Sequence, residues 1–387
     1  MAQPTVLISG AGIAGPALAH WLAGNGYRLV VVEAAPSMRP GGQTVDLRGA
    51  GRDVVARMGL LEAMTERSLF QRGIAWVRSD GTRRAQMPVE AFDGNGIVSE
   101  LEILRGDLTD VLYQATRDAA EYRFGTRISA LEQDADGVGA TLTDGNVVQA
   151  DLVVGADGPH SAVRQLAFGP EEQFIRRLGG YNAWFTAPDM VGLDGWYLMF
   201  QAAGGLNASL RPSHDAATAK AGLAFRSEPI EYDRRDPDAQ RALLADRFRD
   251  AGWYCDELLS AAAESDDFYF DDFVQVHMDT WSSGRVTLCG DAGYCASPLS
   301  GMGTSLALVG ARIVTMKGDE VIEDGTLLVE ANRIVAVGRS DEVAVPAQAL
   351  RIDARGKTVI PGLVDVHWHG PMGEGGILPQ QSWIDYA

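Results

Sequence analysis

A glycine-rich turn between two apolar runs constrains the fold of this chain more than any other feature. Residues 5–10 form a short run rich in β-branched residues, and the turn GAGIAG (residues 10–15) follows it directly. Residues 13–24 then carry apolar side chains at helical spacing, and residues 29–34 form a second apolar run. The order strand, turn, helix and strand predicts a βαβ unit, and therefore a parallel sheet.

In this context the turn predicts a site for a dinucleotide. Its glycines permit a tight turn and a close approach of the backbone to a pyrophosphate, and the helix N-terminus faces the anion. Glu33 ends the second run, where a carboxylate can accept a hydrogen bond from a ribose 2′-hydroxyl. A turn without a ligand is the less favoured alternative, because strand, helix and Glu33 all have the required spacing. The predicted cofactor-binding residues are Gly10, Gly12, Ile13, Ala14, Gly15 and Glu33.

Composition excludes several classes of function. A length of 387 residues indicates more than one domain, and a formal charge of -19 argues against a nucleic-acid partner. No apolar run approaches the roughly 18 residues of a membrane helix, and the first one lacks the basic flank of a signal peptide. We therefore expect a cytoplasmic protein without a membrane partner. Cys255, Cys289 and Cys295 show no CxxC spacing, so neither a disulfide framework nor a zinc knuckle is indicated.

The middle of the chain changes from mixed to strand-rich patterning. Residues 52–67 and 105–120 have helical spacing, and residues 122–155 alternate as strands. Residues 176–280 contain longer, aromatic-rich strands and one amphipathic helix near 238–251. This pattern predicts an antiparallel sheet that is covered on one face.

The last part of the chain changes character again. Residues 284–311 predict a strand, a glycine-rich loop and a helix that begins near Thr304. Residues 312–387 predict short strands, with turns at residues 317–319 and 323–325. We therefore expect a domain boundary at residue 311.

Two further stretches resemble motifs of one enzyme family. DLVVGADGPHSAVR (residues 151–164) and GRVTLCGDAGYCASPLSGMGTSLALVGA (residues 284–311) resemble the DG and GD motifs of the single-component flavoprotein aromatic hydroxylases. That class includes para-hydroxybenzoate hydroxylase and the tetracycline-inactivating monooxygenases. The glycine turn, the segment Arg105-Gly-Asp-Leu108 and these motifs follow the family's order, and GGQTVDLRGAGRDVVARMGLL (residues 41–61) also matches. The resemblance covers about residues 4–311.

The resemblance implies a mixed α/β fold in three parts. A Rossmann-like FAD-binding domain of the para-hydroxybenzoate hydroxylase type would span residues 1–175, with a small substrate-side insert near 70–100. An antiparallel-sheet substrate domain would span residues 176–280, and residues 281–311 would return to the FAD-binding domain. Residues 312–387 would then be a separate β-rich fragment.

The resemblance also implies roles for individual residues toward FAD. Arg105 would reach the pyrophosphate or ribityl region, and Asp291 would hold the ribityl hydroxyls. Asp157 and Gly158 would shape a loop shared by FAD and the reduced nicotinamide. Tyr294 stands where the family commonly has histidine.

Two glycine-rich loops would border the flavin ring. The helix expected from Thr304 would point its positive end at the N1–C2 edge of the ring, where reduced flavin is anionic. The implied residues of these loops are Gly42, Gln43, Thr44 and Asp46 on one side, and Pro298, Gly301, Met302 and Gly303 on the other. Gly290, which precedes Asp291, is a further implied cofactor-binding residue.

The chemistry implied is monooxygenation of an aromatic or polycyclic small molecule. NADH or NADPH would reduce FAD, O2 would be captured as a C4a-hydroperoxide, and one oxygen would pass to the substrate. The sequence assigns no catalytic residue. His214, His277 and Tyr181 are candidates for the substrate pocket, although a structural role is favoured for each. The chain is expected to act as a monomer or a homodimer.

The C-terminal stretch IDARGKTVIPGLVDVHWHG resembles the opening of the amidohydrolase superfamily. His367 and His369 would point to the same side of a strand and could supply two ligands to a metal. The further ligands of such a site come from later barrel strands, which the chain lacks, so we predict no metal site. A metal-dependent amidohydrolase and a non-catalytic flavin-binding hybrid are the alternative functions.

Overall fold

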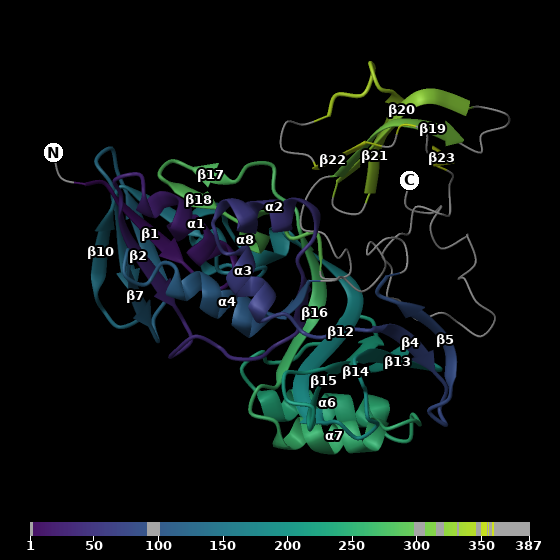
Figure 1. The fold of residues 1–387 in the computed structure, drawn as a ribbon. Helices are drawn as coiled ribbons and strands as arrows, with labels where there is room; N and C mark the ends of the chain where they lie inside the picture. The colour runs from purple at the N-terminus through teal and green to yellow at the C-terminus, as the bar shows by residue number, and fades with distance from the viewer. Residues whose placement is uncertain are drawn as a thin grey trace.

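The structure is a computed structural model that describes residues 3–90, 101–297, 306–314, 321–330, 333–345, 350–353, 355 and 358–359. Figure 1 shows a layered α/β body, a second sheet with two helices beneath it, and a separate group of C-terminal strands. No helix in the described part of the chain is long and apolar enough to cross a membrane.

The α/β body is built on a six-stranded sheet in the order β17-β18-β11-β1-β2-β7. Its neighbours pair in parallel, apart from β17 with β18. All of β1 is buried, as expected of a parallel strand that is covered on both faces. The strands are β1 (Thr5–Ser9), β2 (Arg28–Glu33), β7 (Ala120–Phe124), β11 (Leu152–Gly155), β17 (Ser282–Ser283) and β18 (Val286–Leu288).

Different elements cover the two faces of this sheet. On one face, Leu7 and Val30 pack with the residues of a three-stranded sheet, and on the other, Val6 and Ile8 pack with Ala19 of α1. The alternation along β1 therefore divides its side chains between two cores. The covering elements are β8 (Ile128–Gln133), β9 (Val138–Leu142) and β10 (Val147–Ala150) on the first face and α1 (Ala14–Ala23) on the second.

Short elements surround the carboxyl ends of the parallel strands. They are β3 (Thr44–Asp46), α2 (Gly49–Arg57), α3 (Leu61–Glu66), β6 (Glu102–Leu104), α4 (Arg105–Gln114), α5 (Ala162–Phe168), the 3-10 helix η1 (Glu171–Gln173) and α8 (Asp291–Tyr294). The single helix expected over residues 52–67 is two helices, because Gly59 adopts a positive φ of 72° that ends the first.

The second sheet has seven strands in the order β16-β12-β15-β14-β13-β4-β5. All its neighbours are antiparallel except β13 and β4. The segment near 70–100 contributes strands β4 and β5 at one end of this sheet, where β5 is the edge strand. The strands are β4 (Gly73–Val77), β5 (Arg83–Pro88), β12 (Ile175–Pro188), β13 (Trp196–Ala202), β14 (Leu206–Pro212), β15 (Thr218–Arg226) and β16 (Tyr269–Val276).

Two helices cover only one face of this sheet, as Figure 1 shows. Tyr181 and Phe185 of β12 pack in one core with Leu244 and Phe248 of α6 (Pro237–Phe248). Helix α7 (Cys255–Glu264) adds Leu258 to the same core. The intervening side chains of β12 point to the opposite face, toward the α/β body.

The C-terminal strands differ from two expectations. The helix expected from Thr304 is wrong over its described part, because residues 306–314 form a strand that starts before the boundary expected at 311. Pairing with three other strands outweighs the local helical pattern. The strands are β19 (Leu306–Val314), β20 (Val321–Glu330), β21 (Arg333–Arg339), β22 (Leu350–Asp353) and β23 (Thr358–Val359).

The turn expected at residues 323–325 is also wrong. Strand β20 continues through it, and Asp324 adopts a positive φ of 52°. The register between β19 and β20 shifts on either side of Ala311, which faces Gly325. The local turn signal therefore produces an irregularity within a long strand rather than a reversal of the chain.

Candidate flavin and substrate site

The glycine turn lies tightly between β1, α1 and β11. Gly10 has a φ of 108°, and a Cβ on it would lie 2.4 Å from the carbonyl oxygen of Ala156. A Cβ on Gly15 would lie 1.9 Å from the carbonyl oxygen of Gly10. Ile13 and Ala14 lie within the turn, at the start of α1. Only glycine fits at the first and last positions, and the turn presents bare backbone at the start of the helix.

Glu33 holds this turn from the end of β2. One oxygen of its carboxylate accepts a hydrogen bond from the amide of Ala11 at 2.8 Å, and the other accepts one from the amide of Ala35 at 2.9 Å. The side chain is thereby fixed beside the glycine turn. Its contact with a ribose hydroxyl stays a prediction, which the remaining lone pairs of the carboxylate permit.

Arg105 and Asp291 approach the turn from two other elements. The guanidinium of Arg105 lies 3.2 Å from the position of a Cβ on Gly12. Burial raises the pKa of Asp291, and the charge of Arg105 opposes that rise. Gly290, with a φ of 65°, brings α8 against Ala14, since a Cβ on it would lie 2.9 Å from the Ala14 Cβ. The Arg105 guanidinium and the Asp291 carboxylate therefore both lie near the backbone of the glycine turn.

The loop at residues 41–46 connects this place to the seven-stranded sheet. Its Gly41 and Gly42 have positive φ values of 71° and 84°. The amide of Arg105 donates to the carbonyl of Gln43 at 2.9 Å, and the amide of Gly106 donates to Gly41 at 2.8 Å. The first turn of α4 therefore fixes the loop.

Charged side chains of the sheet meet the same loop from the other side. Arg211 of β14 donates to the hydroxyl of Thr44 and forms an ion pair with buried Glu102. Lys220 of β15 forms an ion pair with Asp267 at 2.9 Å, and a Cβ on Gly41 would lie 2.9 Å from the Lys220 ammonium. These contacts place the loop between the glycine turn and the uncovered face of the sheet. Asp46 pairs with Arg48 at 2.9 Å.

Asp157 and Gly158 lie where β11 leaves the sheet. The Asp157 carboxylate accepts hydrogen bonds from the Ser161 hydroxyl at 2.5 Å and from the Ala162 amide at 2.9 Å, and burial raises its pKa. These hydrogen bonds of the Asp157 carboxylate stabilise the N-terminus of α5. Gly158 has a positive φ of 82°. The expected contact of this loop with cofactor stays a prediction.

Other expected residues lie outside this place. His214 pairs with Asp107 at 2.8 Å and is half-exposed, and His277 is exposed. Tyr181 is buried in the core, where its hydroxyl accepts a hydrogen bond from the Ile230 amide at 2.7 Å. These positions agree with the structural roles favoured for them. Six other candidates lie outside the described residues, namely Pro298, Gly301, Met302, Gly303, His367 and His369.

The sequence did not reveal a charge cluster around His160, which follows Asp157 by three residues in the DG motif. Its Nδ1 lies 3.2 Å from Glu171, and its Nε2 lies 3.4 Å from Asp271. Burial lowers the pKa of His160, but the two carboxylates outweigh burial and raise it. Burial also opposes ionisation of Glu171, whose pKa nevertheless falls to about 2 beside His160 and Arg234. The motif offers a signal for His160, whereas Asp271 lies far along the chain.

His160, Asp271 and Asp272 are close enough together to bind a metal ion. Arg177 and Arg234, however, both pair with Asp272. Because two guanidinium groups already neutralise the carboxylates, we interpret the group as a charge cluster rather than a metal site.

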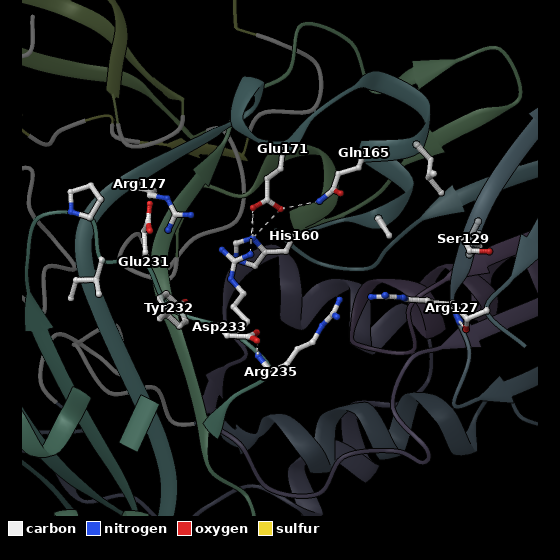
Figure 2. A pocket seen from close by; sticks show the side chains of 17 residues that line it. Arg127, Ser129, His160, Gln165, Glu171, Arg177, Glu231, Tyr232, Asp233 and Arg235 are labelled. Atoms are coloured by element: carbon white, nitrogen blue, oxygen red, sulfur yellow. Dashed lines mark hydrogen bonds and ion pairs between the residues drawn. The ribbon is translucent and has the colours of Figure 1, made fainter. Parts of the chain in front are cut away.

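A cavity of about 970 Å³ adjoins this cluster. Figure 2 shows His160 and Glu171 near the centre of the view, with Arg127 from just before β8, Arg177 of β12 and Arg235 of the loop before α6 around them. Its lining includes Arg127, Arg177, Arg234 and Arg235. No residue of the glycine turn lines it, so it is separate from the place where Gly12, Arg105 and Asp291 meet.

Comparison with known proteins identifies the cofactor of this chain. A family model described as "FAD binding domain" matches residues 3–324. A flavin-dependent monooxygenase of Legionella longbeachae is 40% identical over 336 residues, which are 87% of this chain and 85% of that protein. This chain is an FAD-dependent monooxygenase.

Two further similarities place the monooxygenase within its family. An uncharacterised protein of Mycobacterium tuberculosis (strain H37Rv) is 45% identical over 311 residues, which are 80% of this chain and 83% of that protein. The crystal structure of the tetracycline destructase Tet(51) is 34% identical, with a TM-score of 0.70, and the match covers 78% of each chain. The fold is therefore of the para-hydroxybenzoate hydroxylase type, as expected.

The described residues fit FAD. Gly12 leaves room for a pyrophosphate beside the guanidinium of Arg105, and the buried Asp291 carboxylate can accept hydrogen bonds from hydroxyl groups. The expected amidohydrolase fragment receives no support from these comparisons, because the relatives reported above are monooxygenases or proteins of unstated activity.

Proposed function

We propose that this monooxygenase uses NADH or NADPH and O2 to hydroxylate a planar aromatic or polycyclic molecule. The observation that carries the proposal is that the cofactor residues face the uncovered side of the seven-stranded sheet. The loop at 41–46 contacts both Arg105 of the cofactor side and Lys220 of the sheet. A substrate between cofactor and sheet would be shielded from water on both sides.

When bound, FAD supplies the redox chemistry by the route that the family resemblance implies. Arg105 would neutralise the pyrophosphate, Asp291 would accept hydrogen bonds from the ribityl hydroxyls, and Glu33 would do the same for the ribose. Overall, NAD(P)H, O2, a proton and the substrate would give NAD(P)+, water and the hydroxylated product. The chain's task is then to hold the substrate and to exclude water.

The identity of the substrate class rests on two supports. The similar protein of known structure is named a tetracycline destructase, and tetracyclines are polycyclic. The uncovered face of the sheet also carries aromatic and amide side chains. A tetracycline is therefore the first substrate to test, followed by smaller phenols such as 1-naphthol and salicylate.

In this proposal the reductant binds in the arginine-lined cavity, whose lining includes Arg127 and Arg235. A dinucleotide carries a diphosphate, and guanidinium groups bind phosphate oxygens strongly. The double variant Arg127→Met/Arg235→Met should then raise the KM for NAD(P)H without weakening FAD. Equal KM values in the variant and the wild-type protein would remove this cavity from the proposal.

The central experiment follows NAD(P)H oxidation by the purified, FAD-loaded chain with and without each probe compound. Substrate should accelerate oxidation, and 18O from labelled O2 should appear in the product. If the chain binds FAD but oxidises no NAD(P)H and converts no compound, it is the non-catalytic flavin-binding hybrid instead. Hydrolysis of cyclic amides with a metal bound would favour the amidohydrolase alternative.

A further inference from the structure

The uncovered face of the seven-stranded sheet is ordered in rows across its strands. One row contains Thr186, Lys220 and Arg211, which are direct neighbours in register, and the Arg211 guanidinium carbon lies 3.8 Å from the centroid of the Tyr197 ring. This is the row that meets the loop at 41–46 through Lys220 and Arg211. The row therefore marks the edge of the face that contacts the cofactor side.

The next row contains a tryptophan that lies over a glycine. Trp184 of β12 is directly opposite Gly222 of β15, which is in turn opposite Ser209 of β14. A Cβ on Gly222 would lie 2.6 Å from the Trp184 ring and 2.7 Å from the Ser209 hydroxyl oxygen. The indole therefore fills the space above Gly222 and reaches toward Ser209. Only glycine permits this position of the ring.

A hydrogen bond fixes the plane of the indole. The side-chain oxygen of Asn182 accepts a hydrogen bond from the Trp184 indole N–H. The amide nitrogen of the same Asn182 then donates to the carbonyl of Asp271 at 3.2 Å. Asn182 is buried, so this anchor is protected from water. The ring is thus held at both ends, by Gly222 beneath it and by Asn182 at its nitrogen.

The same row continues toward the cofactor. Tyr269 of β16 is directly opposite Trp184, and the Tyr269 side chain interacts electrostatically with Arg105. Tyr269 is 40% exposed although it lies on a sheet face, and Trp184 is half-buried. Trp184 therefore lies next to the row that contacts the loop at 41–46, and its neighbour within its own row is a tyrosine near Arg105.

We propose that Trp184 is the platform on which the substrate ring stacks, and that Gly222 and Asn182 determine its position. This inference rests on the proposed function and names the substrate class as planar aromatic rings. A rigid, preoriented aromatic face favours offset stacking with such rings at little entropic cost. Aliphatic molecules of the same size would gain less from it.

A neighbouring amide fits a polar substituent on that ring. Asn207 precedes Ser209 by two residues and lies on the same face of β14. Its buried side-chain nitrogen has no hydrogen-bond partner among the described residues. Such a donor should favour substrates with an oxygen acceptor, for example a phenolate or a ring carbonyl.

The experiment measures substrate binding to the FAD-loaded protein with tetracycline and 1-naphthol as probes. Trp184→Ala should raise the KM for the better probe about 10-fold or more, because one buried aromatic contact is lost. Trp184→Phe should raise it about 3-fold, since a smaller ring remains. Gly222→Ala should act like Trp184→Ala although the tryptophan is still present, because the methyl group displaces the ring.

The control is Trp21→Ala, which removes an exposed tryptophan on α1. Its KM for the probe should equal that of the wild-type protein. All variants should keep the FAD affinity and the KM for NAD(P)H, and Trp184→Ala should release more hydrogen peroxide per NAD(P)H because the ring is poorly held.

The outcomes separate this inference from the proposed function. If the wild-type protein converts no probe, both the proposed function and this inference are wrong. If the wild-type protein turns over and both Trp184→Ala and Gly222→Ala leave KM and the peroxide yield unchanged, the platform is wrong while the function stands. A general folding defect is recognised by a parallel loss of FAD, and Trp184→Phe then decides: an unchanged KM in that variant overturns the proposal.

Discussion

The two proposed sides of the active site, a cofactor side and a substrate side, use different chemical groups of the chain. The cofactor side uses bare backbone at Gly10, Gly12 and Gly15, within six consecutive residues. The substrate side uses side chains such as Arg211 and Lys220, whose ion-pair partners lie on other elements. The first is specified by local spacing, and the second only by the fold. The two sides should therefore respond differently to substitution.

The largest effect is expected on the cofactor side, at Gly15. The variant Gly15→Ala places a Cβ 1.9 Å from the carbonyl oxygen of Gly10, a separation that no small adjustment can relieve. The turn must open, so we expect complete loss of bound FAD, measured by the flavin absorbance of the purified protein. Gly24→Ala at the other end of α1 is the matched control, because nothing lies within 4 Å of its Cβ. A yellow Gly15→Ala protein would contradict the tight turn.

The next largest effect is expected on the substrate side, at the buried ion pair. Arg211→Met leaves Glu102, which is 1% exposed, without its cation. Breaking a buried pair in this way costs about 3–5 kcal/mol of unfolding free energy, measured in urea. Removing both charges with Arg211→Met/Glu102→Gln should recover part of that loss.

An exposed pair provides the comparison for this result. Arg28 and Glu121 are about half-exposed, so Arg28→Met should cost below about 1 kcal/mol. Equal losses in Arg28→Met and Arg211→Met would show that the charges beneath the loop at 41–46 are solvated.

The same contrast explains what the sequence could predict. The glycine turn, α1 and Glu33 lie within one βαβ unit, and all three were predicted from spacing. Arg211 and Lys220 lie in strands that the sequence predicts only as a sheet, and nothing local indicates their registers. The position of Trp184 over Gly222 likewise depends on the pairing of β12 with β15, which no local pattern predicts.

The incorrect predictions have the same origin. Residues 306–311 carry a helical pattern, but they pair with strands that follow them by up to 44 residues, as Leu306 and Leu350 illustrate. The cluster around His160 was missed because its carboxylates at Glu171 and Asp271 come from η1 and β16. Local patterns cannot account for partners so distant in the chain.

A smaller effect is expected from Asp291→Ala on the cofactor side. The carboxylate is buried near Arg105, where it should accept hydrogen bonds from ribityl hydroxyls. Losing charge-assisted hydrogen bonds should weaken FAD by about 1.5–3 kcal/mol, or roughly 10-fold to 100-fold in Kd. Fluorescence titration of the apoprotein with FAD measures this change. An unchanged Kd would separate Asp291 from the cofactor.

The smallest effect is expected at Asp267 on the substrate side, and it depends on pH. Burial opposes its ionisation, but hydrogen bonds from Lys220, Ser265 and Thr186 outweigh burial and lower the pKa of Asp267 to about 2. A carboxyl group with a lowered pKa stabilises the folded chain above its ordinary pKa near 3.8, and this contribution is lost as the pH falls toward 2.

The variant Asp267→Asn tests this sign directly. At pH 7 it should be less stable than the wild-type protein by about 2 kcal/mol, which is the free energy that corresponds to the shift. The difference should shrink as the pH falls from about 4 toward 2, because the wild-type carboxylate is then protonated. Asp118→Asn, at a side chain that is 95% exposed, gives the background effect of removing one carboxylate. If the difference in unfolding free energy between the wild-type protein and Asp267→Asn stays constant down to pH 2, Lys220 does not keep this carboxylate charged. The contact between Lys220 and Asp267 beneath Gly41 would then be a hydrogen bond to a neutral carboxyl group and not an ion pair.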